Sequence, residues 1–146
     1  MIDLDDIDRK ILRELTSNGG LNAAALGKMI GLTQPSAWRR VKRLEDAGVI
    51  TGRQIMLDRH KLGFDVVVYL GVKLAAKGRV GLEDFERAVC AIPEVQLVQH
   101  VLGVYDYRLK VVARDLPDFE RILRRRIMTL PGVGEVESNV MLSEEK

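Results

Sequence analysis

A short basic segment contains the side chains of this sequence that are best suited to recognition chemistry. Between Gly31 and Gly48 the chain packs four cationic side chains into five positions, preceded by an amide and a hydroxyl side chain. Lysine and arginine neutralise phosphates, and arginine can donate two hydrogen bonds to the O6 and N7 atoms of guanine. Amide and hydroxyl groups reach base edges or phosphates. The candidate nucleic-acid contacts are Gln34, Ser36, Arg39, Arg40, Lys42 and Arg43.

The same segment has the signals of a helix that would present those side chains together. Thr33 is a good N-cap residue, and Pro35 falls in the first turn, where a missing N–H costs little. At about 100° per residue, Ala37, Val41 and Leu44 share one face, opposite most of the basic residues. The sequence therefore predicts a helix with one buried side and one basic side. The alternative is that the basic side is only a solvated face.

Two shorter helices are predicted before the basic one. Asp5, with Asp8 three residues later, has the pattern of a capping box, and apolar residues then repeat at helical spacing up to Leu15. Asn22 is expected to cap a second helix, which Gly31 can end in the left-handed conformation. Three short helices, the last of them basic on its open side, form the helix-turn-helix pattern, whose recognition helix enters the major groove of DNA.

Two residues of the basic helix are ambiguous from the sequence. Arg40 lies between the exposed and the buried side, so it is expected to anchor either to a phosphate or to an acidic residue of the first helix. Trp38, the only tryptophan, lies at the edge of the basic face. Packing against a neighbouring helix is the simpler interpretation of Trp38, and contact with a base is the alternative.

The second half of the chain contains an internal repeat. The tetrapeptide DFER occurs at 84–87 and again at 118–121, and IPEV at 92–95 is matched by LPGV at 130–133. Each copy predicts a helix, a proline stop and a strand. Since each copy is also preceded by an apolar strand-like segment, the predicted order is β-α-β-β-α-β, the ferredoxin-like arrangement.

A sheet of this kind carries both helices on one face and leaves the other face open. In a domain this small the simplest cover is a second subunit, so a homodimer is expected. The strands at 66–74 and 133–142, with Val67 and Tyr69 on the open face, are the predicted contact.

These patterns together predict an α+β fold with two domains. The β-branched and apolar segment at 49–57 predicts a strand or wing that completes a winged helix-turn-helix domain at 1–57. A connector is expected at 58–64, and the ferredoxin-like domain at 65–146.

Two polar features of the second domain have structural alternatives. Gly103 allows close backbone approach, and the Asp106 carboxylate could pair with an ammonium group or cap the turn; from the bare sequence the segment is a structural hairpin. Arg126 falls seven residues after Phe119, on the apolar stripe of the second predicted helix. Extension of its charged end into water at a helix terminus is the expected explanation.

The composition bounds the class of protein. The 146 residues are 47% hydrophobic and 30% charged, the balance of a globular protein. The net charge of +2 arises in residues 1–60, which carry ten lysines and arginines against eight acidic residues. The longest apolar run, at 66–72, is too short to span a bilayer, and the acidic first residues are unlike a signal peptide, so a cytoplasmic location is expected.

Catalysis is not indicated. A lone Cys90 excludes an internal disulfide framework and a cysteine-rich zinc site. With His60 and His100 it is the only obvious nucleophile or base, and no catalytic motif, metal-ligand spacing or phosphate-binding loop accompanies these residues. We therefore expect no enzyme, no cofactor and no metal. Cys90 is expected to be a partly exposed thiol, and His100 a strand residue at the dimer face.

The chain resembles the Lrp/AsnC, or feast/famine, family of bacterial and archaeal transcriptional regulators along nearly its whole length. The individual motifs are weak, and their order makes the resemblance specific. The matching segments are Leu4-Asp5 with Asp8 and Ile11-Leu12, then Gly31-Leu32-Thr33, Arg40-Val41, Leu44-Glu45 and Gly48-Val49-Ile50, then Gly103-Val104-Tyr105-Asp106-Tyr107 and Leu130-Pro131-Gly132-Val133.

The resemblance implies a winged DNA-binding domain joined to a ferredoxin-like domain that dimerises, often assembles into octamers and binds a small effector between dimers. The expected function is a sequence-specific transcriptional regulator of pseudo-palindromic double-stranded DNA, whose assembly or DNA affinity responds to that effector, usually an amino acid. A winged-helix protein-interaction module and a ferredoxin-like enzyme are the alternatives. The candidate effector-binding residues are Gly103, Val104, Tyr105 and Asp106.

Three positions depart from the family pattern. Pro35 replaces a small hydroxyl residue, which removes a possible phosphate or base contact. The sequence at 18–20, Asn-Gly-Gly, replaces an acidic-Gly-Arg turn and removes one cation. Leu102 stands where a threonine is common, so one polar contact to an effector is absent.

Overall fold

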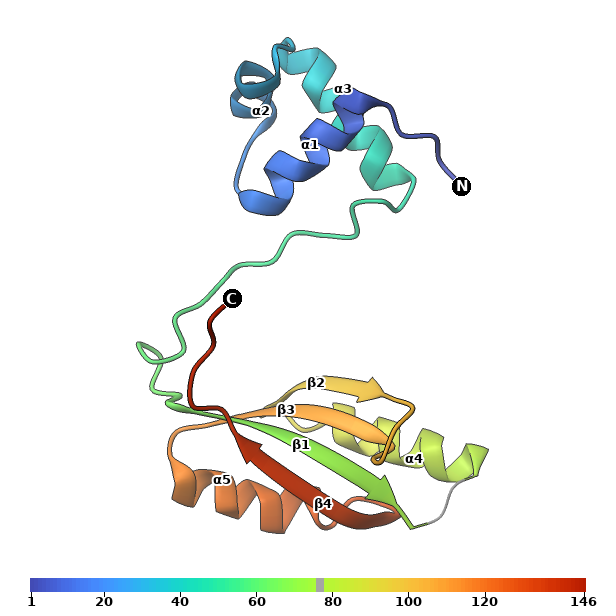
Figure 1. The fold of residues 1–146 in the computed structure, drawn as a ribbon, viewed down its shortest axis with the longest axis vertical. Coiled ribbons are helices and arrows are strands. Elements are labelled where there is room, and N and C mark those ends of the chain that lie inside the picture. Colours follow the sequence, from blue (N-terminus) through green and yellow to red (C-terminus); the bar gives the residue numbers. More distant parts are fainter. Residues whose placement is uncertain (76–77) are drawn as a thin grey trace. The chain divides into compact units, whose positions relative to one another are not determined.

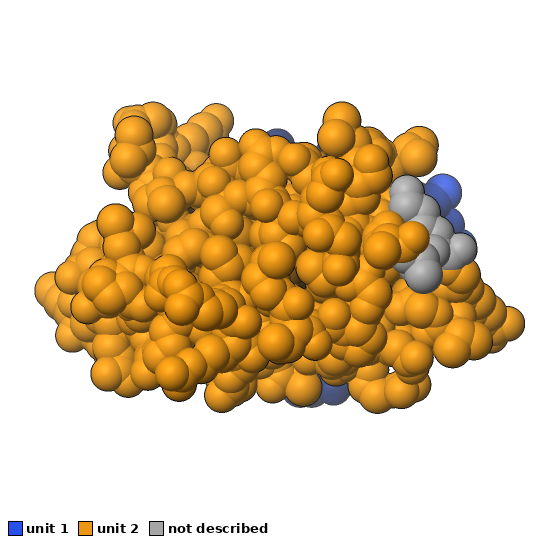
Figure 2. All heavy atoms as spheres, turned by 90° about the horizontal axis from the view of Figure 1, so that it is seen from below, with its two compact units in different colours: residues 1–57 blue, residues 58–146 orange. Residues whose placement is uncertain are grey.

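The chain divides after residue 57 into two units, each with its own hydrophobic core. The computed structural model describes residues 1–75 and 78–146. Residues 1–57 form unit 1 and residues 58–146 form unit 2, shown in different colours in Figure 2. In the part of the chain that the structure describes, no helix has the length and apolar character needed to cross a membrane.

Unit 1 consists of three helices, α1 (Asp6–Ser17), α2 (Ala23–Ile30) and α3 (Gln34–Asp46) (Figure 1). The predicted caps are confirmed. Asp5 and Asp8 form a reciprocal capping box, and the side chains of Asn22 and Thr33 accept hydrogen bonds from the third residue beyond each cap. Gly31 ends α2 with φ of 77°, a left-handed conformation that suits glycine.

The core of unit 1 is small. Its buried apolar cluster consists of Ile11, Leu26, Val41 and Leu44, one or two residues from each helix. The predicted inner face of α3 is confirmed, since Ala37 is buried beside Val41 and Leu44. The opposite side of α3 is left to solvent.

No strand forms at 49–57, where the sequence predicts a strand or wing. These residues all lie in the described part of the chain, and none of them is in a strand. The N–H groups of Val49 and Ile50 instead donate to the carbonyl of Leu44, which turns the chain back onto α3. Ile55 and Met56 are almost fully exposed. A strand requires a neighbour for its ladder, and the three helices of unit 1 offer none.

Unit 2 has the predicted β-α-β-β-α-β order and forms a four-stranded antiparallel sheet in the order β2-β3-β1-β4. Helices α4 and α5 both pack on one face of the sheet (Figure 1). The ferredoxin-like prediction is therefore confirmed. The elements are β1 (Val66–Leu74), α4 (Arg79–Cys90), β2 (Val95–His100), β3 (Tyr107–Ala113), α5 (Leu116–Ile122), the π-helical turn η1 (Leu123–Ile127) and β4 (Val133–Val140).

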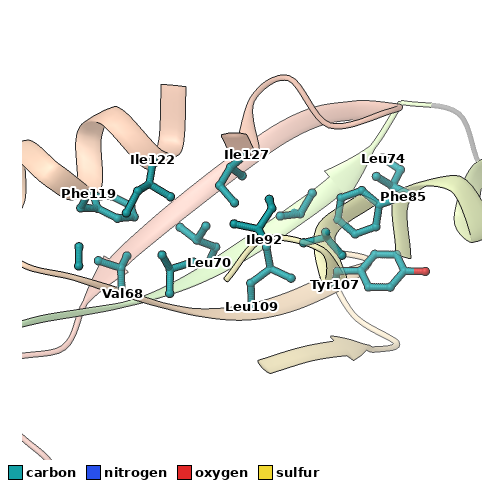
Figure 3. Close-up of a cluster of buried hydrophobic side chains, with 14 residues drawn as sticks. Val68, Leu70, Leu74, Phe85, Ile92, Tyr107, Leu109, Phe119, Ile122 and Ile127 are labelled. Atoms are coloured by element: carbon teal, nitrogen blue, oxygen red, sulfur yellow. The ribbon is translucent and has the colours of Figure 1, made fainter. Parts of the chain in front are cut away.

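The core of unit 2 lies between the sheet and its two helices (Figure 3). Alternate residues of β1 and β3 point into it, as expected for strands with one buried face. Phe85 of α4 packs against Tyr107 of β3 with ring centroids 4.6 Å apart. The Tyr107 hydroxyl donates to Glu86 at 2.6 Å, which satisfies the polar end of this buried ring.

The second helix of unit 2 resolves the position of Arg126. Phe119 and Ile122 lie on the buried side of α5, and a regular helix would place Arg126 beside them. The π turn η1 adds one residue to that turn, so Ile127 is fully buried and Arg126 is exposed. The predicted position of Arg126 on the apolar stripe is therefore wrong.

Two predictions about the open face of the sheet also need correction. Val67 is only 1% exposed and lies opposite the buried Val112, while the Met141 N–H donates to the Val67 carbonyl at 2.9 Å. That end of the face is therefore covered within the single chain. His100 lies opposite Tyr107 and stacks on it at 4.7 Å, so its ring is on the helix side of the sheet and not on the open face.

Candidate functional site

Helix α3 presents most of the predicted contact residues to solvent. Gln34, Arg39, Lys42 and Arg43 are exposed. Ser36 is half-buried in the first turn, where its N–H donates to the Thr33 hydroxyl at 3.3 Å. All six candidates therefore lie on one helix, but they differ in solvent exposure and in whether they have a partner within the chain.

Arg40 and Arg43 are bound to carboxylates of the first helix. The Arg40 guanidinium donates to Asp5 at 2.7 Å and to Asp8 at 3.1 Å, and Arg43 donates to the other oxygen of Asp8. Asp8 is fully buried, and it is the only buried charged residue among those the structure describes. Of the two anchors expected for Arg40, the isolated chain uses the acidic one.

The ion pairs change the charge behaviour of this corner of unit 1. The hydrogen bond from Arg40 lowers the pKa of Asp5 from 3.8 to about 2, with help from the Asp8 N–H. The same contact with Asp5 raises the pKa of Arg40. Both shifts favour the charged form of the side chain, so the Asp5–Arg40 pair is ionised throughout the physiological pH range.

The start of α3 is the least constrained part of the surface. Gln34, Pro35, Trp38 and Arg39 line a shallow hollow there. Trp38 is 57% exposed, so packing against a neighbouring helix covers less than half of it. An exposed aromatic ring next to an exposed arginine suits contact with a base or a sugar.

Two further cations of unit 1 have partners. Lys42 pairs with Asp46 one turn later at 3.2 Å, a solvent-exposed contact that stabilises little. Arg53, which the sequence reasoning did not single out, donates to the carbonyls of Gly19 and Leu21 at 3.2 and 3.1 Å. It fastens the segment after α3 to the turn between α1 and α2, and no local sequence signal reveals such a contact.

The loop between β2 and β3 contains the candidate effector residues, and its backbone is well anchored. The Val101 N–H donates to the Asp106 carbonyl and the Asp106 N–H to the Val72 carbonyl, both at 2.9 Å. The Asp106 carboxylate accepts from the Leu74 N–H, also at 2.9 Å. Asp106 therefore has a turn-fixing role that joins the loop to β1.

Tyr105 lies across the open face of the sheet. Its hydroxyl donates to Glu137 of β4, and this hydrogen bond raises the pKa of Tyr105. The ring lies over Gly71 of β1, where an added Cβ would be 2.7 Å from the ring. Gly71 is therefore needed for the close approach of Tyr105.

The tip of the loop is open. Leu102 is fully exposed, Val104 is 78% exposed and Gly103 is exposed between them. A Cβ built at Gly103 meets no atom within 4 Å. The four candidate effector residues are thus divided into an exposed pair, Gly103 and Val104, and an anchored pair, Tyr105 and Asp106.

Comparison with known proteins identifies a family for each of the two units. Residues 4–51 match the model of a winged helix-turn-helix DNA-binding family, and residues 67–146 match the Lrp/AsnC ligand-binding domain. The chain belongs to the Lrp/AsnC family. It is a DNA-binding transcriptional regulator with a ligand-binding domain, and the family is one of regulators and not of enzymes.

Several Lrp/AsnC relatives align with nearly the whole length of this chain. The proline dehydrogenase transcriptional activator of Rhizobium radiobacter is 36% identical over 99% of this chain and 92% of its own. The leucine-responsive regulatory protein of Escherichia coli K12 is 34% identical over 99% and 88%. The solved complex of a Neisseria meningitidis transcriptional regulator with L-methionine aligns with a TM-score of 0.93 at 29% identity, covering 99% and 93%.

Proposed function

We propose that this regulator binds a roughly palindromic duplex as a dimer, and that an amino acid bound at residues 103–106 changes its assembly or its DNA affinity. The observation that supports DNA recognition most directly is the free surface at the start of α3. Gln34 and Arg39 are exposed there beside the half-exposed Trp38, while the inner side of the helix is fixed in the core. Of the six residues predicted from the sequence, Gln34, Ser36, Arg39 and Lys42 are the proposed DNA contacts. Arg40 and Arg43 are held by carboxylates at the start of α1 in the isolated chain.

The DNA contact is tested by enrichment of duplexes from a random pool, followed by affinity measurements. Arg39→Ala should weaken binding to the enriched duplex by about 1–3 kcal/mol if Arg39 contacts a base. Arg13→Ala, which removes an exposed arginine of α1, is the matched control and should change affinity little. Equal losses in the two variants would contradict a base contact by Arg39.

The proposed dimer contact is the open face of the sheet around Tyr69. On this face β3 and β4 carry opposite charges, with Arg108 and Lys110 on β3, and Glu135 and Glu137 on β4. A two-fold related copy can therefore place the basic strand of one subunit opposite the acidic strand of the other. Assembly into octamers is a further proposal that rests on the family alone.

Light scattering on the chain and on Lys110→Glu tests this arrangement. The variant places two like charges opposite each other across the proposed interface and should shift the chain toward monomer. Arg87→Glu reverses an exposed charge on α4, away from the open face, and should leave the assembly unchanged. A dimer that persists in Lys110→Glu would place the interface elsewhere.

The loop tip is the proposed effector contact. A zwitterion needs an acceptor for its ammonium group and donors for its carboxylate, and exposed backbone at Gly103 and Val104 supplies the donors. Proline, leucine and L-methionine occur in the names of the relatives, which supports an amino acid as the ligand. Coupling of about 1–3 kcal/mol between ligand and assembly is the expected scale.

Calorimetry with the twenty amino acids tests the effector site. Asp106→Ala is a poor probe, because Asp106 also fixes the end of β1. Gly103→Ala is better, since the added methyl meets no atom of the chain yet hinders approach to the backbone. It should weaken the binding amino acid severalfold, while Gly52→Ala, an equally open position in unit 1, should not. Equal binding in both variants, or no binding by wild type, would contradict the proposal.

We also propose the domain limits 1–57, 58–64 and 65–146 and a cytoplasmic site of action. The division of the structure after residue 57 and the family matches at 4–51 and 67–146 support these limits. A regulator that acts on DNA without a membrane-spanning helix in its described residues suits the cytoplasm.

A further inference from the structure

Two carboxylates and two arginines form a closed cluster between α1 and α3. Asp5 and Asp8 are fixed first by backbone, since the Asp8 N–H donates to Asp5 at 2.8 Å and the Asp5 N–H to Asp8 at 3.2 Å. The side chains of Arg40 and Arg43 then bind to these oxygens. The acids are therefore pre-positioned, and they orient the arginines.

We propose that Asp5 and Asp8 withhold Arg40 and Arg43 from DNA phosphates, and so keep the non-specific affinity of this regulator low. Asp5 and Asp8 are thus positioning residues that set specificity. The inference rests on DNA binding by α3 and assigns its arginines two different roles. Arg39 is free to contact DNA, whereas Arg40 and Arg43 are neutralised within the protein.

The burial of Asp8 makes the cluster resistant to competition from phosphate. A phosphate that captured Arg40 or Arg43 would remove one of the two arginine partners of the fully buried Asp8 carboxylate, and loss of a partner from a buried charge is destabilising. The pair Lys42–Asp46 is the contrast. Both of its side chains are more than half exposed, so a phosphate can replace Asp46 at little cost.

Withheld arginines have a measurable signature in salt. Each phosphate contact contributes about 0.9 to the slope of log affinity against log salt, and this contribution is independent of sequence. Withholding two arginines therefore removes up to about twice that slope from all duplexes alike. Discrimination between operator and other DNA then depends on the exposed residues at the start of α3.

The test uses the full chain, a random-sequence duplex and the duplex that wild type enriches from a random pool. Asp5→Asn is the informative variant, because asparagine is as good an N-cap as aspartate and the helix is retained. It should steepen the salt slope on random DNA by about 0.9 and raise that affinity roughly five- to tenfold at low salt. Preference for the enriched duplex should fall correspondingly.

Asp46→Asn is the matched control for net charge. It makes the same change in charge on an exposed part of α3, and its effect on the slope should be clearly smaller because Lys42 is already accessible. The double variant Asp5→Asn with Arg40→Gln should lose the gain, since the released arginine is absent. Asp8→Asn should act in the same direction where it folds, which circular dichroism establishes.

Three outcomes overturn the inference. The first is a folded Asp5→Asn protein whose slope on random DNA is unchanged or shallower, which is the behaviour of a purely structural cluster. The second is an equal change of the salt slope in Asp46→Asn, which would show that net charge alone explains the effect. The third is a gain that survives Arg40→Gln. Wild type that binds no duplex contradicts DNA binding itself, whereas wild type that binds with no change in Asp5→Asn contradicts the inference alone.

Discussion

The two units of this regulator are stabilised by different means. The described core of unit 2 contains fourteen buried apolar residues, most of them from two helices and two strands, whereas that of unit 1 contains four. Unit 1 adds a buried carboxylate, Asp8, and side-chain caps on all three of its helices. Apolar packing therefore dominates unit 2, and polar contacts have a larger share in unit 1.

The difference teaches that in unit 1 the residues suited to DNA are also part of the scaffold. Arg40 and Arg43 have the charge for phosphate contact, yet they join α3 to α1. In unit 2 the exposed loop tip at Gly103 does not pack against the scaffold, since a Cβ built there meets no atom within 4 Å. A built-in pair of probes reports on the units separately, because the single tryptophan is in unit 1 and all three tyrosines are in unit 2.

The largest effect is expected from Phe85→Ala in unit 2. Phe85 is fully buried against Tyr107, and truncation of a buried phenylalanine costs about 3–5 kcal/mol. Denaturant unfolding should show a weakened transition by tyrosine near-ultraviolet circular dichroism and an unchanged one by Trp38 fluorescence. Val80→Ala, an exposed position on the same helix, is the control and should change little. Coincident loss of both signals would show that the units do not unfold independently.

Gly71→Ala should have the next largest effect, again in unit 2. The added methyl falls 2.7 Å from the Tyr105 ring, so the ring must move or the strand must shift, at a cost of about 1–3 kcal/mol. Tyr105→Ala should relieve the clash, so the double variant should be more stable than the sum of the two single changes predicts. Simple additivity in denaturant unfolding would mean that Tyr105 does not lie over Gly71 in solution.

Asn22→Ala tests the polar contribution in unit 1. The Asn22 side chain accepts from the Ala25 N–H at 2.8 Å, and loss of an N-cap costs about 0.5–2 kcal/mol. Trp38 fluorescence should report the loss, while the tyrosine signal stays constant. Asn22→Asp keeps the cap and should be nearly neutral. An equal loss in the aspartate variant would assign the effect to something other than the cap.

The smallest effects are expected from pH, and they have opposite signs in the two units. The pKa of Asp5 is held at about 2, below its ordinary 3.8, so its stabilisation of unit 1 is present above about pH 4 and lost as pH falls toward 2. Burial raises the pKa of Tyr107 above its ordinary 10.0, so its stabilisation of unit 2 is complete below pH 10 and lost as pH rises beyond it.

Methyl NMR resonances of the two cores measure both pH effects in one sample. Asp5→Asn should remove the acid sensitivity of unit 1, and Tyr107→Phe should remove the alkaline sensitivity of unit 2. Each variant serves as the control for the other. Loss of the unit 2 resonances before those of unit 1 in acid, or the reverse order in alkali, would contradict the prediction.

Local signals predicted much of this fold. The caps at Asp5, Asn22 and Thr33 depend on residues three positions apart, and the sequence contains that information directly. The repeat of helix, proline and strand predicted the order of unit 2, and the open side of α3 followed from helical spacing. Contacts within one element or one repeat are thus accessible from sequence.

Most of the errors concern partners in other elements, and Arg126 is the exception, because a local π turn moves it out of the apolar stripe. The segment near Ile55 is predicted to be a strand, but unit 1, all of whose residues the structure describes, contains no other strand beside which it could pair. His100 was assigned to the open face, although its side is set by pairing with Tyr107. Arg40 had two possible anchors, and only the packing of α3 on α1 brings Asp5 within 2.7 Å of it.

The π turn at Leu123–Ile127 has a consequence for how this chain can vary in length. Ile127 reaches the core only because η1 contains one residue more than a regular helix needs. Three consecutive arginines, at 124–126, occupy the outer side of that turn. Deletion of one of them would restore regular helical spacing between Phe119 and the isoleucine, so the fold contains a position at which a whole residue is dispensable to the core.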